Sequence, residues 1–387
     1  MIEYEDIVSL HIEASSHCNA SCPVCPRNHH GGPVYPWFDK KHLTLEDHKK
    51  FFPAELAARQ LLILYCGNLG DPSLNPELLE ICQWWLSHRP TMAIQINTNA
   101  GTRDAKFWSD LGKLFVGTYC NVTFSVDGLE DTNHLYRRGV HWSNVKTAME
   151  SYIGSGGPAV WEFLVFKHNE HQVEEARELA MKMGFKSFFS KKAMGFAGAN
   201  ETRSIPVLKR DGTLDYHLYP TSNSELRNKA AVNERTSKAY VPEGDPIKVY
   251  DSFPPKEDLN LRLDSYTENK FNCSKIDCMA NKGKQIYVSA MGNVYPCCFI
   301  GSRHFAPNKH NFTNRQIQTF LGNGNFSLHQ RSLREIVEDD WFKNSYTSSW
   351  KKPTVREGKL AVCAEFCSAD VTEMKEATSH RAKLGED

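Results

Sequence analysis

The sequence carries no excess of charge of either sign and has no long hydrophobic run. Its 387 residues include 46 Lys and Arg against 46 Asp and Glu, so the overall charge gives no reason to expect nucleic acid or an anionic membrane as a partner. The acidic N-terminus lacks the apolar segment of a signal peptide, and no later stretch is long enough to span a membrane. We therefore expect a cytoplasmic protein whose 40% hydrophobic residues supply an ordinary buried core.

Cysteine is the residue type that the sequence has in abundance. Thiols stay reduced in the cytosol, so twelve cysteines in a chain without a secretory signal argue against a disulfide framework and for metal binding. Seven of them fall into two groups, one near each end of the chain. The lone cysteines Cys66, Cys82 and Cys120 are expected to be buried core residues, although Cys66 ends a predicted strand beside a candidate binding loop.

The first cysteine group is Cys18-x3-Cys22-x2-Cys25, directly after a short apolar segment. Thiolates are soft ligands that select zinc or iron-sulfur clusters. A [4Fe-4S] cluster that only carries electrons uses four protein thiolates, so three thiolates leave one iron open for another ligand. The alternative is a structural zinc site, in which His29 would complete a tetrahedron.

At these positions the sequence resembles the radical S-adenosylmethionine (SAM) superfamily, which has this cysteine spacing in a loop after the first barrel strand. The resemblance implies that Cys18, Cys22 and Cys25 hold a [4Fe-4S] cluster whose open iron binds SAM. It also implies a flavodoxin-type or ferredoxin-type electron donor. SAM would then be cleaved to a 5'-deoxyadenosyl radical that abstracts hydrogen from carbon. Val24 departs from the family, which often has an aromatic residue before the third cysteine.

Short apolar strands alternate with helical patterns over the first half of the chain. Such repeats indicate a parallel sheet, which right-handed crossovers curl into a full or partial barrel. The resemblance implies an α/β fold with a partial (β/α)6 TIM-like barrel. Thr44 followed by Asp47 predicts the start of the first helix. The predicted strands are 8–12, 60–65, 93–97, 122–126, 160–166 and 187–190, and the predicted helices are 45–59, 76–88, 104–114, 142–153 and 170–183.

The second cysteine group lies in the last third of the chain. Alternating residues on both sides of Gly292 predict a β-hairpin that brings Cys278 and Cys297 together. A later loop carries Cys363 and Cys367 and could complete four ligands. Four thiolates could also hold a structural zinc ion.

This second group resembles the twitch and SPASM domains of radical SAM enzymes, which hold auxiliary [4Fe-4S] clusters. A full SPASM domain has further cysteines that are absent between Cys298 and Cys363, so the one-cluster twitch version is the better match. Cys273 and Cys298 are further candidate ligands, although Cys297 has the motif spacing. The implied ligands of the second cluster are Cys278, Cys297, Cys363 and Cys367.

The chain is expected to divide into a barrel and a small α+β domain. The segment between them is polar, with no sustained periodicity and one short predicted helix near residues 224–234. The four expected parts are the radical SAM core 1–198, the connector 199–272, the twitch domain 273–370 and the C-terminal tail 371–387.

Residues that follow barrel strands are candidates for SAM binding, because active sites of such barrels lie at the carboxyl ends of their strands. The resemblance implies that the stretch 67–72 binds the SAM amino group through its backbone. It also implies that Arg137 meets the SAM carboxylate, a task for which a guanidinium offers paired donors. Asp71 could instead belong to a plain turn that caps the following helix. Arg138 could take the role of Arg137, or Arg137 could be a solvated surface residue. The implied SAM-binding residues are Gly70, Asp71, Asn99, Ser125, Asp127 and Arg137.

Two further polar residues accompany the fifth predicted strand. Glu162 interrupts its apolar pattern, where a buried carboxylate is costly unless it has a partner. It faces either the barrel interior as a ligand-binding group or a helix that carries a salt-bridge partner. Asn169, with Gln172 three residues later, predicts a helix cap.

These observations predict a radical SAM enzyme that acts on a carbon atom of its substrate. If four protein thiolates hold the auxiliary cluster, substrate cannot coordinate there, and electron transfer in a net dehydrogenation is the expected role. A small-molecule substrate is preferred because the chain begins almost directly at the first barrel strand. The alternative is modification of a peptide or protein side chain, and a non-enzymatic zinc or iron-sulfur protein is a more remote one.

Overall fold

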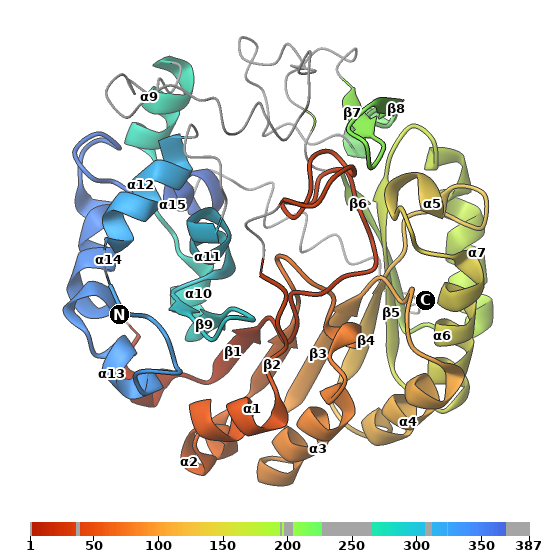
Figure 1. Cartoon of the computed structure of the whole chain (residues 1–387), viewed down its shortest axis with the longest axis horizontal. Coiled ribbons are helices and arrows are strands. Elements are labelled where there is room, and N and C mark those ends of the chain that lie inside the picture. Colours follow the sequence, from red (N-terminus) through yellow and green to blue (C-terminus); the bar gives the residue numbers. More distant parts are fainter. Residues whose placement is uncertain are drawn as a thin grey trace.

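In the described residues, eight strands form a single curved sheet, in which β1 to β6 run parallel and in sequence order (Figure 1). The predicted α/β fold with a partial barrel is therefore confirmed. The computed structural model describes residues 2–35, 39–193, 196, 204–226, 265–305, 312–322 and 324–368. None of the helices in these ranges could serve as a membrane span. The strands of the barrel are β1 (Ser9–Ile12), β2 (Leu62–Tyr65), β3 (Ala93–Thr98), β4 (Asn121–Ser125), β5 (Ala159–Val165) and β6 (Ser187–Lys192).

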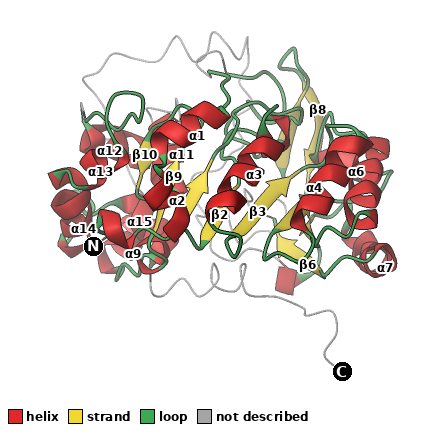
Figure 2. Ribbon diagram, turned by 90° about the horizontal axis from the view of Figure 1, so that it is seen from below, coloured by secondary structure: helices red, strands yellow, loops and turns green. Residues whose placement is uncertain are grey.

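Helices cover the outer face of the sheet, as Figure 2 shows for α1, α3, α4 and α6. Each follows a strand and returns the chain to the start of the next one, which is the connection that a parallel sheet requires. The barrel helices are α1 (Leu45–Phe51), α2 (Ala54–Arg59), α3 (Leu78–His88), α4 (Ala105–Phe115), α5 (Asn133–Tyr136), α6 (Trp142–Gly154) and α7 (Val173–Met183).

The first predicted helix is wrong in one respect, because residues 45–59 form two helices and not one. The break falls at Pro53, which lies between α1 and α2. Proline has no N–H to donate and its ring clashes with the preceding turn, so it does not continue the helix. The predicted start is confirmed, since Thr44 and Asp47 form a reciprocal capping box at the N-terminus of α1.

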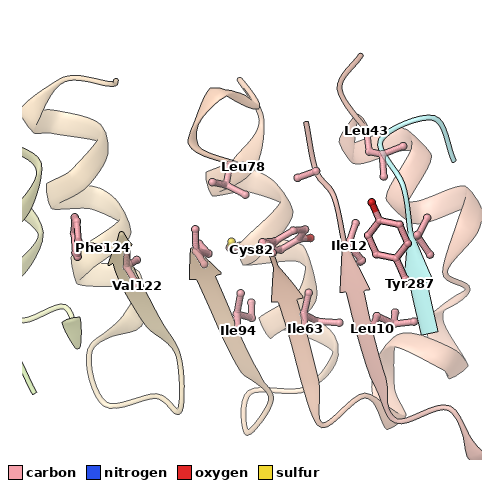
Figure 3. Close-up of a cluster of buried hydrophobic side chains, with 14 of the residues drawn as sticks. Leu10, Ile12, Leu43, Ile63, Leu78, Cys82, Ile94, Val122, Phe124 and Tyr287 are labelled. Carbon is pink, nitrogen blue, oxygen red and sulfur yellow. The ribbon is translucent and has the colours of Figure 1, made fainter. Parts of the chain in front are cut away.

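Alternate positions along the strands separate the hydrophobic core from the barrel interior. Residues on the outer face, such as Ile94 and Phe124, are fully buried against the helices. The half-buried positions on the inner face include polar residues such as Asn97, Ser125 and Glu162. The fold therefore places polar side chains inside the barrel. Figure 3 shows the core on the outer face, with Leu10, Ile12, Ile63, Leu78, Cys82, Ile94, Val122 and Phe124.

The predicted hairpin in the C-terminal part of the chain is confirmed, and it extends the barrel sheet. Strands β9 (Gln285–Val288) and β10 (Val294–Tyr295) pair antiparallel around Gly292, whose φ is 73°. Strand β9 also pairs parallel with β1, so the hairpin continues the sheet beyond its first strand (Figure 1). This pairing could not be predicted, because the pattern of a strand indicates its two faces and not its neighbour in the sheet.

Small helices surround this hairpin at one end of the curved sheet (Figure 1). The cysteines of the second group lie in or directly before three of these helices, and therefore on the same side of the molecule as β1. The helices are α9 (Ser265–Cys273), α10 (Met279–Lys282), α11 (Cys298–Phe305), α12 (Phe312–Leu321), α13 (Leu333–Val337), α14 (Tyr346–Ser348) and α15 (Ala361–Cys367).

The connector contains regular structure that was not predicted. Strands β7 (Ile205–Leu208) and β8 (Leu214–Leu218) form an antiparallel hairpin, which Arg138 holds through the Leu208 carbonyl at 2.7 Å and Asp215 at 2.9 Å. Of the helix predicted near residues 224–234, a 3-10 turn at Ser224–Leu226 is present, and the rest lies outside the described residues. The predicted tail 371–387 also lies outside them.

Candidate active site

A pocket of about 420 Å³ opens at the carboxyl ends of the barrel strands. The three cysteines of the first group lie on its wall, together with the loops that follow β2, β3 and β4. All six residues implied to bind SAM line the same pocket, so the structure brings the complete predicted set together. They are Gly70, Asp71, Asn99, Ser125, Asp127 and Arg137.

The cysteine loop is held by hydrogen bonds from charged and amide side chains around it. Arg27 donates through Nη1 to the Cys18 carbonyl at 3.2 Å, and Asn28 donates to the Cys22 carbonyl at 3.4 Å. Asn99 Nδ2 lies 3.6 Å from Cys18 Sγ, and Arg137 Nη1 lies 3.8 Å from Cys22 Sγ. The loop thus presents its thiols to the pocket beside donors that favour thiolates.

Burial raises the pKa of all three thiols in the protein alone. The pKa of Cys18 rises to about 12, and the pKa values of Cys22 and Cys25 rise to about 11. Metal ligation requires the thiolate form. Binding of a cluster at these positions would therefore release protons.

A buried carboxylate that was not predicted as a site residue shapes the loop after β2. Glu13 Oε1 accepts hydrogen bonds from the backbone N–H groups of Leu69 at 2.5 Å and Gly70 at 3.1 Å. Its other oxygen accepts one from Tyr287 of β9 at 3.1 Å. Gly70 packs so closely on the chain that a Cβ there would lie 1.8 Å from the Ser15 carbonyl oxygen. A carboxylate directly after a buried strand was the sequence signal for Glu13.

Asp71 ties the same loop to the end of β3. Its Oδ1 accepts from Ser73 N–H at 3.0 Å and from the Thr98 hydroxyl at 2.8 Å, and its Oδ2 accepts from Asn99 N–H at 2.7 Å. Asp71 also caps the 3-10 turn Pro72–Leu74. The turn-capping role considered for Asp71 is therefore present, and both carboxylate oxygens are engaged within the fold.

Asp127 and Arg137 form a buried ion pair beside Cys22. Arg137 Nε donates to Asp127 Oδ2 at 2.6 Å, and Asp127 Oδ1 accepts from Leu164 N–H at 2.6 Å. Burial raises the pKa of Asp127, and the guanidinium offsets this in part. Only 18% of the Arg137 side chain is exposed, which excludes a solvated surface position. Arg138 points instead to the β7–β8 hairpin, so of these two neighbouring arginines Arg137 is the one that lines the pocket.

Glu162 faces the barrel interior and pairs with a cation from the next strand. Its Oε1 lies 2.7 Å from Lys191 Nζ, and both side chains line the pocket. The interior position considered for Glu162 is correct, whereas its salt-bridge partner comes from β6 and not from a helix. Lys191, which carried no motif in the sequence, belongs to this wall.

Asn169 does not cap a helix through its side chain, so that prediction is wrong. A 3-10 turn at Glu170–Gln172 precedes α7, and no capping hydrogen bond forms there. The Asn169 amide instead donates to the carbonyls of Asp127 at 2.8 Å and Leu164 at 2.9 Å. These hydrogen bonds join the ends of β4 and β5, so Asn169 helps to position Asp127 and Leu164, which line the pocket.

The four predicted ligands of the second group also converge. Cys278 and Cys367 share a hydrogen bond, which lowers the pKa of Cys278 to about 6. The Cys297 and Cys363 thiols lie close enough to interact electrostatically with Cys278 and with each other. The Tyr346 hydroxyl lies 3.3 Å from Cys278 Sγ. The four thiols therefore lie in the same region of the C-terminal part of the chain.

The other two cysteines of this region have different surroundings, although Cys298 also interacts electrostatically with Cys297. Cys273 is exposed at the end of α9. Cys298 interacts electrostatically with Cys66 and Glu13, on the barrel side. Asn68 connects the two regions by donating to the Cys298 carbonyl at 2.9 Å. Cys82 and Cys120 are buried in the core as predicted, whereas Cys66 is half-buried and lines the pocket.

A structural zinc ion was the alternative considered for each cysteine group, and it requires ligands that lie close around one ion. Across the described ranges, no three His, Cys, Asp or Glu side chains converge tightly enough to hold a single metal ion. His29 does not line the pocket of the cysteine loop, and its Nδ1 lies 3.4 Å from the Tyr35 hydroxyl. Neither predicted cysteine group is therefore a preformed site for one ion.

The chain has the radical SAM fold. The crystal structure of Streptococcus suis SuiB bound to S-adenosylmethionine matches it with a TM-score of 0.52 at 14% identity, over 88% of this chain and 68% of SuiB. SuiB bound to the precursor peptide SuiA matches with a TM-score of 0.51 at 13% identity, over 95% of this chain and 73% of SuiB. The resemblance predicted from the cysteine motif is confirmed at the level of the fold.

Sequence comparison adds one curated relative, and no family model matches. The "Tungsten-containing aldehyde ferredoxin oxidoreductase cofactor-modifying protein" of Pyrococcus furiosus is 25% identical over 187 residues. That match covers 45% of this chain and 48% of the relative. The similarity in sequence therefore spans about half of each protein.

Proposed function

We propose that this protein is a radical SAM enzyme that abstracts hydrogen from a carbon atom of its substrate. Cys18, Cys22 and Cys25 would hold a [4Fe-4S] cluster that, when reduced with SAM bound, supplies a 5'-deoxyadenosyl radical. The observation that carries this proposal is the common pocket, which is lined by these three cysteines and by all six residues implied to bind SAM. The donor set fits the cluster, because three soft thiolates leave one iron for SAM.

The residues around the cysteine loop have separate tasks in this proposal. Glu13 fixes the loop 67–72 through two backbone N–H groups, so that the loop is ordered before the cosubstrate arrives. Asp127 engages Arg137 Nε and orients its guanidinium toward the pocket. The remaining guanidinium N–H groups suit a carboxylate such as that of SAM. Asn99 lies against Cys18 and holds the loop end of β3.

The second cysteine group would hold an auxiliary [4Fe-4S] cluster within a C-terminal unit of residues 273–370, next to a barrel core of residues 1–198. The convergence of Cys278, Cys297, Cys363 and Cys367 supports this assignment. Four protein thiolates leave no iron open, so the role would be to accept an electron. A hydrogen abstraction followed by loss of that electron and of a proton would be a net dehydrogenation. An external donor of the flavodoxin or ferredoxin type would supply the reducing electron.

A small molecule is the proposed substrate class, with a peptide as the second candidate. The name of the Pyrococcus furiosus relative describes a cofactor-modifying protein, which supports a small-molecule substrate. The structure of SuiB with the precursor peptide SuiA supports the second candidate.

Anaerobic reconstitution with iron and sulfide, followed by reduction and addition of SAM, tests this function. We expect 5'-deoxyadenosine and about eight irons per chain, the sum for two [4Fe-4S] clusters. A variant with Cys18, Cys22 and Cys25 replaced by Ala should keep its fold and about four irons but form no 5'-deoxyadenosine. Zinc in place of iron, with no SAM cleavage by the wild type, would contradict the proposal.

A further inference from the structure

Two charged side chains stand on the wall of the pocket formed by β5 and β6. Lys191 Nζ and Glu162 Oε1 are 2.7 Å apart, with 29% and 23% of their side chains exposed. The two strands pair in parallel, and Leu164, which also lines the pocket, is in register with Lys191. The pair therefore sits on the strands farthest in the sheet from β1.

The surroundings of this pair place it inside the barrel. Trp161 and Phe163, the neighbours of Glu162 in β5, are fully buried in the core on the opposite face of the strand. Cys66, at the end of β2, also lines the pocket, and its thiol interacts electrostatically with both Glu162 and Lys191. The pair thus faces the pocket from the side of β5 and β6.

Glu162 differs from the two other carboxylates that line the pocket. Asp71 and Asp127 use both of their oxygens to bind backbone or side-chain donors of the fold. Within the described part of the chain, the ion pair with Lys191 is the contact found for Glu162. An ion pair in a partly desolvated position adds little to stability, because the loss of hydration opposes the attraction. Its presence inside a pocket is better explained by a ligand.

We propose that Glu162 and Lys191 anchor the substrate, and that the substrate carries a carboxylate next to a hydroxyl or amino group. The ammonium of Lys191 would bind the carboxylate, and the carboxylate of Glu162 would accept a hydrogen bond from the neighbouring hydroxyl or amino group. The two protein atoms lie only 2.7 Å apart, so a ligand must offer its two polar groups close together to contact both. This assignment rests on the proposed function, whose substrate class it narrows to 2-hydroxy or 2-amino acids.

Ligand binding to the reconstituted, unreduced full chain tests the assignment without turnover. Saturation-transfer NMR would measure racemic lactate and L-alanine as probes, with propionate as the comparator that lacks the second polar group. The variants are Lys191→Met and Glu162→Gln. Lys192→Met is the matched control, because Lys192 is the next residue of β6 and does not line the pocket. Far-UV circular dichroism verifies that each variant is folded.

We expect lactate or alanine to bind the wild type more tightly than propionate. Lys191→Met should weaken that binding about ten-fold or more, since a charge-assisted hydrogen bond is lost, and Lys192→Met should leave it unchanged. Equal binding by wild type and Lys191→Met, or no binding of any probe to the wild type, would overturn the assignment. Formation of 5'-deoxyadenosine by the same wild-type preparation shows separately whether the proposed function holds.

Discussion

Replacing Glu13 tests whether one buried carboxylate organises the loop that borders the pocket. Its two oxygens satisfy the backbone donors of Leu69 and Gly70 and the hydroxyl of Tyr287, all in buried surroundings. Glu13→Ala leaves three donors without an acceptor, and each buried unsatisfied donor costs about 1–3 kcal/mol. Burial raises the pKa of Glu13, so removing the carboxylate also relieves a desolvation cost. We therefore expect a net destabilisation of about 2–5 kcal/mol.

Glu13→Gln separates the hydrogen bonds from the charge. The Gln side-chain oxygen can still accept from Leu69 and Gly70, and the Tyr287 hydroxyl can rotate to accept from the amide. This variant should lose about 1 kcal/mol. Glu150→Ala, on the exposed face of α6, is a matched control that should change stability by less than about 0.5 kcal/mol.

Anaerobic urea unfolding, followed by tryptophan fluorescence, measures these differences. The variants can be compared where their m-values agree with that of the wild type. The reasoning is refuted if Glu13→Ala is as stable as the wild type, or if Glu13→Gln is as destabilised as Glu13→Ala. In either case Glu13 would not be the acceptor that holds the loop.

Three further predictions concern single side chains. Arg137→Lys should weaken SAM binding about ten-fold or more, through loss of paired donors, while Arg138→Lys should leave it within about two-fold, as equilibrium dialysis with SAM would show. Cys297→Ser should remove about four irons per chain, while Cys298→Ser should keep the wild-type iron count. Burial raises the pKa of Glu170, but hydrogen bonds from three side chains outweigh this effect and lower the pKa to about 2. The stability that it contributes should therefore be complete above its unfolded value of about 4.3. Urea unfolding of the cluster-free protein should then show the difference between wild type and Glu170→Gln shrinking as the pH falls below 4.3 toward 2.

The parallel barrel could be predicted from the sequence because each strand and helix carries a local pattern. Apolar runs such as residues 93–97, followed by a polar loop and a helical period, specify a repeating unit whatever the rest of the chain does. Boundaries moved by one or two residues, as at β3 and α4. The one broken helix was visible as Pro53, whose effect on the backbone is local as well.

Long-range pairings could not be predicted in the same way. Nothing in residues 285–288 indicates that they lie beside Ser9–Ile12, because register depends on which strand edge is free when the chain folds. The orientation of Lys191 could not be predicted either, since a lysine at a strand end is usually exposed. Its inward position follows from pairing with Glu162 across two strands. The cysteine spacing predicted the candidate ligands, whereas the acceptor role of Glu13 and the inward position of Lys191 follow from three-dimensional contacts.

The pairing of β9 with β1 holds the two cysteine groups in a fixed position relative to each other. The loop that carries Cys18 to Cys25 follows β1, and the hairpin that leads to Cys297 begins at β9, its direct neighbour in the sheet. The Tyr287 hydroxyl, on β9, donates to Glu13, and Asn68 donates to the Cys298 carbonyl. Backbone and side-chain hydrogen bonds thus fix one group relative to the other. A fixed separation of this kind would suit electron transfer between the two proposed clusters, and so supports the proposal that the two cysteine groups serve one reaction.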